Sequence, residues 1–144
     1  MCYFILIGIC VISLQVNEAR AIDQICLHLK MPSGMVGITG PVLKLGFMDY
    51  GNSHFSLSGT ATTTIVTIGF PKIIGLVHGN AEIVNDQLEA SLTGSTMSSD
   101  NNTASNLFYH LRIDLTTLTG AYTMTEADGT VTRKGDVSVV TCSD

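Results

Sequence analysis

The segment Val77–Gly94 constrains the fold of this sequence most, because it has the pattern of one antiparallel hairpin. Asn85-Asp86 can form a two-residue turn, since both residue types tolerate the positive φ of a tight turn. Side chains alternate between the two faces of a strand, so the segment has one apolar face and one polar face. The apolar face pairs Ile83 with Leu88, Ala81 with Ala90, Gly79 with Leu92 and Val77 with Gly94. The pattern therefore predicts two half-buried strands in a fixed register.

Other segments alternate in the same way, and turn-forming residues separate them. These predicted strands are Gln24–Met31, Val42–Asp49, His54–Ala61, Asn106–Ile113, Leu118–Thr125 and Val137–Cys142. Thr62–Gly69 either extends the third of them or forms its own, and Arg133–Asp136 is interpreted as a polar break. No segment has a sustained helical period, and glycines recur in mid-strand, as a curled sheet requires. The sequence predicts an all-β fold of about 8–9 strands, either an antiparallel up-and-down barrel or a sandwich.

The composition agrees with strands and turns, because the chain is rich in Thr, Ser and Gly, has no Trp, and is 13% charged. Its net charge is −5, and no basic cluster is present that could neutralise phosphates. Nucleic acid is therefore excluded as an expected partner.

Residues 1–21 have the features of a secretory signal peptide. An apolar run over residues 3–14 precedes Ala19-Arg20-Ala21, a small-x-small pattern of the kind that signal peptidase cleaves. The run is too short for a helix that spans a bilayer, which needs roughly 20 residues. We therefore expect a single mature domain, residues 22–144, that is secreted or periplasmic and has no stable membrane insertion after cleavage.

Export would leave two cysteines, Cys26 and Cys142, because Cys2 and Cys10 depart with the signal. Two cysteines in an oxidising compartment predict one disulfide bond. That bond would place the first and last strands side by side. We therefore expect a closed barrel, with the sandwich as the alternative.

The polar residues match no catalytic or metal-binding motif. The four histidines lack a recognised ligand spacing, and neither a nucleophile elbow nor a phosphate loop occurs. Glu82 and Glu89 would lie opposite each other on the hairpin's polar face, where solvated carboxylates are the simplest interpretation. The chain is predicted to be non-catalytic, without a metal or cofactor, although an enzyme site on the barrel rim is left open.

The apolar face combines aromatic with very small side chains. Large residues opposite small ones can fill a barrel completely, or the small ones can leave room for a ligand. The first function hypothesis is binding of a small apolar ligand in the interior by Phe47, Phe55, Tyr109 and Tyr122. The alternative is a structural or surface-interaction protein with a solid core, whose outer polar face contacts another protein or a glycan.

Overall fold

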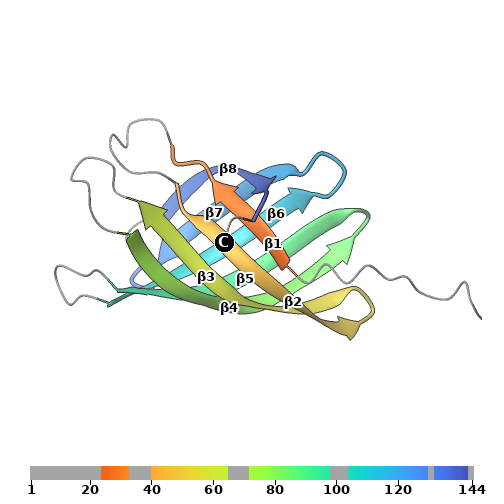
Figure 1. The fold of residues 1–144 in the computed structure, drawn as a ribbon, viewed down its shortest axis with the longest axis horizontal. Coiled ribbons are helices and arrows are strands. Elements are labelled where there is room, and N and C mark those ends of the chain that lie inside the picture. Colours follow the sequence, from red (N-terminus) through yellow and green to blue (C-terminus); the bar gives the residue numbers. More distant parts are fainter. Residues whose placement is uncertain (1–23, 33–39, 65–71, 98–103, 130–131, 143–144) are drawn as a thin grey trace, which may run out of the picture.

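The chain folds into a closed barrel of eight antiparallel strands, each hydrogen-bonded to the next and β8 to β1 (Figure 1). The computed structural model describes residues 24–32, 40–64, 72–97, 104–129 and 132–142, so the predicted signal peptide lies outside the described residues. The strands are β1 (Gln24–Leu29), β2 (Val42–Gly51), β3 (His54–Thr64), β4 (Lys72–Val84), β5 (Gln87–Met97), β6 (Ala104–Asp114), β7 (Thr119–Glu126) and β8 (Thr132–Val140). The predicted barrel is confirmed.

The register predicted for the central hairpin is also confirmed. Ala81 pairs with Ala90 and Val77 with Gly94 across β4 and β5. Asn85 and Asp86 have φ values of 50° and 61°, the positive values that a tight hairpin turn requires. The local pattern alone was sufficient here because a slip of one residue would turn the whole apolar face outward.

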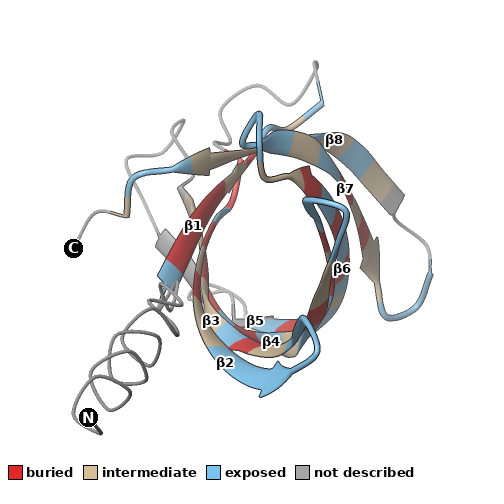
Figure 2. Ribbon diagram, turned by 90° about the vertical axis from the view of Figure 1, so that its right-hand side faces the viewer, coloured by how far each residue is buried: buried red, intermediate tan, exposed pale blue. Residues whose placement is uncertain are grey.

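The core lies inside the barrel, and all eight strands contribute buried residues to it. Figure 2 shows the buried positions on the ribbon of the closed barrel. The sheet can curl this tightly because mid-strand glycines let neighbouring backbones approach. A Cβ atom built on Gly59 would collide with the Lys44 carbonyl, and one on Gly79 would collide with the Ser91 carbonyl. The predicted role of these glycines in a curled sheet is consistent with that geometry.

The two ends of the barrel are built differently. Three turns, at residues 52–53, 85–86 and 115–118, close one end, which we call the hairpin-turn end. Backbone hydrogen bonds join each turn to the next hairpin: the Ile83 amide donates to the Ser53 carbonyl at 2.9 Å, and the Leu115 amide to the Asp86 carbonyl at 2.8 Å. At the other end the connections include residues outside the described ranges.

The seam of the barrel is the pairing of β1 with β8, where Cys26–Leu29 lie opposite Val137–Val140. The predicted disulfide bond joins Cys26 to Cys142 there, with the two Cα atoms 5.2 Å apart. Cys26 points to the outer face yet is buried. The sequence predicted that Cys142 lies within the last strand, but β8 ends at Val140 and Cys142 lies just beyond it.

Three details of the sequence interpretation are wrong or incomplete. Arg133–Asp136 is part of β8 and not a break. Lys134 and Asp136 face solvent, while Gly135 lies inside, against the ring of Tyr122. Leu118 is not on the apolar face but in the last turn, 48% exposed. β3 ends at Thr64, and the rest of Thr62–Gly69 lies outside the described residues.

Candidate functional site

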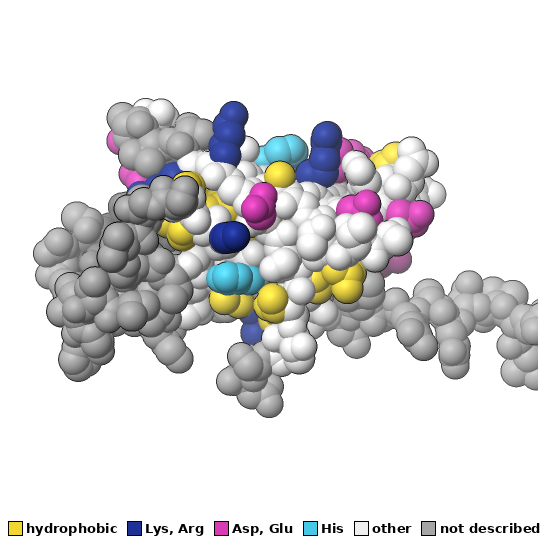
Figure 3. All heavy atoms as spheres, turned by 90° about the horizontal axis from the view of Figure 1, so that it is seen from above, with side chains coloured by type: hydrophobic (Ala, Val, Ile, Leu, Met, Phe, Trp, Pro, Cys, Tyr) yellow, Lys and Arg dark blue, Asp and Glu magenta, His cyan; other side chains and the backbone are white. Residues whose placement is uncertain are grey.

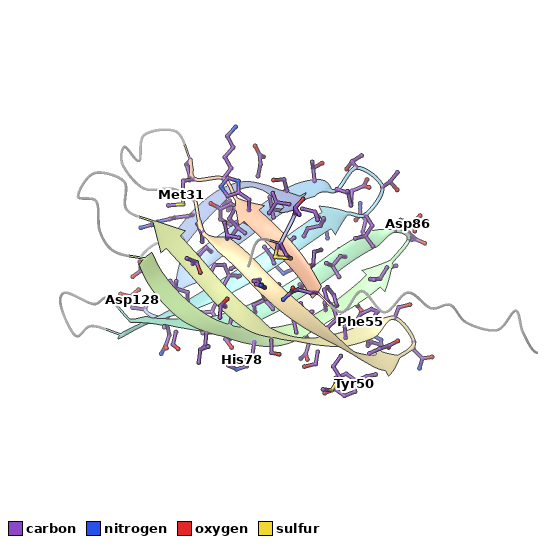
Figure 4. All side chains as sticks on the ribbon, in the orientation of Figure 1. Met31, Tyr50, Phe55, His78, Asp86 and Asp128 are labelled. Carbon is purple, nitrogen blue, oxygen red and sulfur yellow. A yellow bond between two sulfur atoms is a disulfide. The ribbon has the colours of Figure 1, made fainter. Side chains whose placement is uncertain are left out.

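The four aromatic residues predicted to bind a ligand form two separate pairs inside the barrel. The Phe47 and Phe55 rings have centroids 5.7 Å apart and planes at 83°, an edge-to-face contact. Figure 4 shows Phe55 toward the hairpin-turn end. Tyr109 on β6 and Tyr122 on β7 are diagonal neighbours in the ladder between these strands. The structure thus brings Phe47 and Phe55 into ring contact and places the two tyrosines on neighbouring strands.

Tyr122 is held by the seam. Its hydroxyl donates to the Lys30 carbonyl at 3.0 Å, and the Met31 Sδ lies 3.9 Å away. Its ring lies against Gly135, where an added Cβ would come within 2.9 Å of the ring. Burial raises the pKa of Tyr122, and Asp136 adds to the increase while Arg133 opposes it. Tyr122 is thus a packing residue whose polar atom is already satisfied.

Tyr109 differs because no hydrogen bond joins its hydroxyl to another residue within the described ranges, although no buried side-chain oxygen or nitrogen atom there lacks a partner. The residue is 3% exposed, and its ring borders Gly94, which has no side chain to fill that place. Burial, with a smaller contribution from nearby Tyr122, raises the pKa of Tyr109 to about 12. Of the two tyrosine hydroxyls, that of Tyr122 is bonded within the described ranges.

The buried side chains in the middle of the barrel pack against one another in one cluster. A void large enough for water would give the side chains around it measurable accessible surface. The exposed fraction is 0% at Leu27, Leu29, Leu43, Leu111 and Ile113. Ligand pockets usually enclose about 300–1,000 Å³, and these five positions leave no such space beside them.

A shallow pocket of about 210 Å³ lies on the outer face of β3–β6. It is lined by His54, Asn80, Ala81, Glu82, Glu89, Ser91 and His110. Glu82 and Glu89 lie directly opposite each other, as the hairpin register predicted. Most of the lining groups are hydrogen-bond acceptors or can act as acceptors, so the pocket suits a ligand group that donates hydrogen bonds.

The flanking strands supply a partner for each carboxylate. The Arg112 Nη2 atom lies 2.7 Å from a Glu89 carboxylate oxygen, whereas the His54 Nδ1 atom lies 3.8 Å from a Glu82 oxygen. Glu89 is therefore firmly paired and Glu82 only weakly. Sequence reasoning missed these neighbours, since a hairpin pattern does not say which strands lie on either side of it.

The histidines face outward and do not form a metal site. His78 Nε2 lies 3.1 Å from the Thr93 hydroxyl, and His110 Nδ1 lies 3.4 Å from the Ser91 hydroxyl. Within the described ranges, no group of three or more His, Cys, Asp or Glu side chains could hold a metal ion. His28 lines a second outer pocket of about 400 Å³ on β1, β7 and β8, with Lys30 and Asp136.

None of the described residues forms a helix long and apolar enough to span a membrane. Known family models, curated proteins and solved structures contain no match to this chain.

Proposed function

We propose that this protein is an exported, non-catalytic interaction module with a solid core, which holds another protein against the outer face of β3–β6. The observation that supports this proposal best is the complete burial of five interior side chains, together with a polar pocket on the outside. A filled interior favours the surface-interaction hypothesis over the interior-ligand hypothesis. Export is supported by residues 1–21 and by the Cys26–Cys142 bond, which suits an oxidising compartment.

The pocket is too small for a whole ligand of drug size, so it fits one group of a larger partner. The carboxylate of Glu82 is 47% exposed, and its ionic contact within the described ranges is the weak one with His54. A protonated amine or a guanidinium group would bind these acceptors with charge-assisted hydrogen bonds. A basic side chain of a partner protein therefore fits the pocket better than an acidic or an apolar group.

A test of the solid core enlarges two interior alanines. Ala61→Leu and Ala90→Leu should each lower the free energy of unfolding by about 1–3 kcal/mol, because extra methyl groups overpack a filled core. Chemical denaturation measures the change. Unchanged or increased stability in both variants would mean that the barrel is hollow, and this part of the proposal would then be wrong.

A test of the surface places a photo-activatable cross-linking residue at Ser91, in the pocket, and at Lys134, an exposed position on β8. In protein exported by its own host, the Ser91 position should give a defined covalent partner and the Lys134 position should not. Equal labelling at both positions, or none at Ser91, contradicts binding by the outer face of β3–β6.

A second proposed function is suggested by Tyr109, because no hydrogen bond joins its hydroxyl to another residue within the described ranges. In this case an apolar ligand with one polar group binds inside the barrel and forms its hydrogen bond with Tyr109. Native mass spectrometry of protein purified from its host should then show a bound mass that Tyr109→Phe loses. A bare protein mass together with destabilised Ala61→Leu and Ala90→Leu variants contradicts it.

A further inference from the structure

The negative charge of the described surface is concentrated at the hairpin-turn end. Within three residues of the three turns lie five carboxylates: Asp49, Glu82, Asp86, Glu89 and Asp114. Among Lys and Arg, only Arg112 lies within the same distance of a turn in the described part of the chain. Figure 3 shows acidic side chains gathered toward this end, which is the end marked by Asp86 in Figure 4. The barrel therefore has one acidic end.

Large apolar side chains are exposed at the same end. Those near the three turns are Tyr50 at 68%, Met48 at 62%, Val84 at 52% and Leu118 at 48% exposed. Figure 4 shows that Tyr50 points away from the barrel, at the same end as Asp86. Exposed apolar residues bordered by charged ones are typical of protein-binding surfaces.

Leu118 is the least expected of these residues. Its φ is 58°, the left-handed conformation that glycine and asparagine adopt at lower cost than a bulky residue. A leucine at this position is unfavourable twice, because its backbone is strained and its side chain is in water. Such strain is often found at functional sites, and contact with a partner would offset both costs.

Backbone hydrogen bonds also hold the turns of this surface in place. Hydrogen bonds between adjacent turns tie the three hairpins together, and the Val139 amide donates to the Leu118 carbonyl at 2.9 Å. A surface held in one conformation loses little conformational entropy on binding.

We propose that the hairpin-turn end docks a basic segment of another protein, in which arginine or lysine side chains alternate with apolar ones. This inference rests on the proposed function, that of a surface-interaction module, and names the partner's chemistry. The basic side chains meet Glu82 and Asp86, and one of them enters the outer pocket. The apolar side chains cover Tyr50 and Leu118. Charge complementarity selects such a segment over an acidic peptide or a neutral glycan.

The test uses the whole mature protein and a short synthetic peptide of alternating arginine and leucine, with binding measured by fluorescence anisotropy. Replacing Glu82 by Gln and Asp86 by Asn together should raise the dissociation constant about tenfold, which corresponds to about 1.4 kcal/mol. Asn tolerates the positive φ of Asp86, so the turn is retained. Glu126→Gln removes a carboxylate at the opposite end of β7, away from the three turns, and should leave affinity nearly unchanged. Equal weakening by the control, or equal binding of an alternating glutamate-leucine peptide, overturns the proposal.

A second variant separates docking from a structural role. Leu118→Asn should keep or increase the melting temperature, since Asn accepts the left-handed conformation, but should weaken peptide binding severalfold. Unchanged binding by Leu118→Asn overturns the proposal even if the fold is intact. If cross-linking at Ser91 captures a partner while the peptide does not bind, the docking surface fails and the interaction module stands. If the Ala61→Leu and Ala90→Leu variants show that the barrel is hollow, the solid core of the proposed function is wrong, and the docking surface is not affected.

Discussion

The wall formed by β3–β6 and the seam between β1 and β8 close the same barrel by different means. In the wall, β3 pairs with β4 from His54 to Thr64, and β5 pairs with β6 over the whole length of both strands. At the seam the ladder runs only from Cys26 to Leu29. The seam adds what the wall does not have, a disulfide bond and the hydrogen bond from Tyr122 to the Lys30 carbonyl. A short ladder is thus reinforced by bonds from outside it.

The largest loss of folding stability is expected from a substitution in the wall. Ala90→Lys places a charge in the filled interior and should cost about 4 kcal/mol or more, enough to prevent folding of a marginal domain. Glu82→Lys, on the outer face of the partner strand, should change stability by only about 0.5 kcal/mol. Circular dichroism and chemical denaturation compare the two. Equal tolerance would contradict the register of β4 and β5.

Removing the seam's cross-link should have the next largest effect. Because Cys26 and Cys142 are 116 residues apart in sequence, replacing both by Ala should cost about 2–5 kcal/mol. The β signal in circular dichroism should persist, since the ladders and the core remain. Each single variant should behave like the double one, because all three lack the same bond. Two reactive thiols in natively exported protein would show that the seam is not cross-linked.

High pH should weaken the wall through Tyr109. Its pKa is raised from 10.0 to about 12 in the folded state, so the unfolded chain releases this proton first. The stability that this tyrosine contributes is fully present below pH 10 and is lost as the pH rises to 12. The loss is about 2–3 kcal/mol at the conversion of 1.36 kcal/mol per pKa unit. Unfolding experiments should show that Tyr109→Phe loses less stability than the wild type in this range. An identical alkaline loss would mean that Tyr109 is not desolvated.

Replacing each tyrosine by Phe at neutral pH separates the wall from the seam. Tyr122→Phe should cost about 0.5–1.5 kcal/mol, because it removes the bond to the Lys30 carbonyl. Tyr109→Phe should be nearly neutral, since its hydroxyl makes no hydrogen bond within the described residues. Denaturant titrations at neutral pH test the order. A larger loss for Tyr109→Phe would reveal a partner for that hydroxyl.

The smallest effect is expected at the turn that leads from the wall into β7. The Asp114 carboxylate accepts hydrogen bonds from the amides of Thr117 at 3.0 Å and Thr116 at 2.8 Å, which lower its pKa from 3.8. Its contribution is therefore present above pH 3.8 and is lost as the pH falls through the lower folded value. Asp114→Ala should be slightly less stable than the wild type at neutral pH, and the two should converge in acid. A difference that persists in acid would contradict this role.

The aromatic candidates show where sequence reasoning reached its limit. Alternation placed Phe47, Phe55, Tyr109 and Tyr122 on the inner face, and the structure has all four inside the barrel. It could not say that the phenylalanines pair near one end while the tyrosines lie on β6 and β7. That separation depends on the tilt and closure of the whole sheet.

The outer pocket also combines features that the sequence predicts with features that it does not. The opposition of Glu82 and Glu89 follows from the turn alone, because two residues fix the register of a hairpin. Their partners, His54 and Arg112, come from neighbouring hairpins. Which hairpins become neighbours is decided only when the sheet assembles.

The sequence by itself determined the strand class, the central hairpin, the inner and outer faces and the pair of cysteines. These features follow from a period of two, from turn chemistry and from the composition of the chain, all of which act over a few residues. The tertiary structure alone decided which side chains pack together in the middle of the barrel, that Tyr122 is bonded to the Lys30 carbonyl, and that carboxylates and exposed apolar residues meet at the hairpin-turn end. These depend on distances between residues far apart in the chain, which are set when eight strands close on one another.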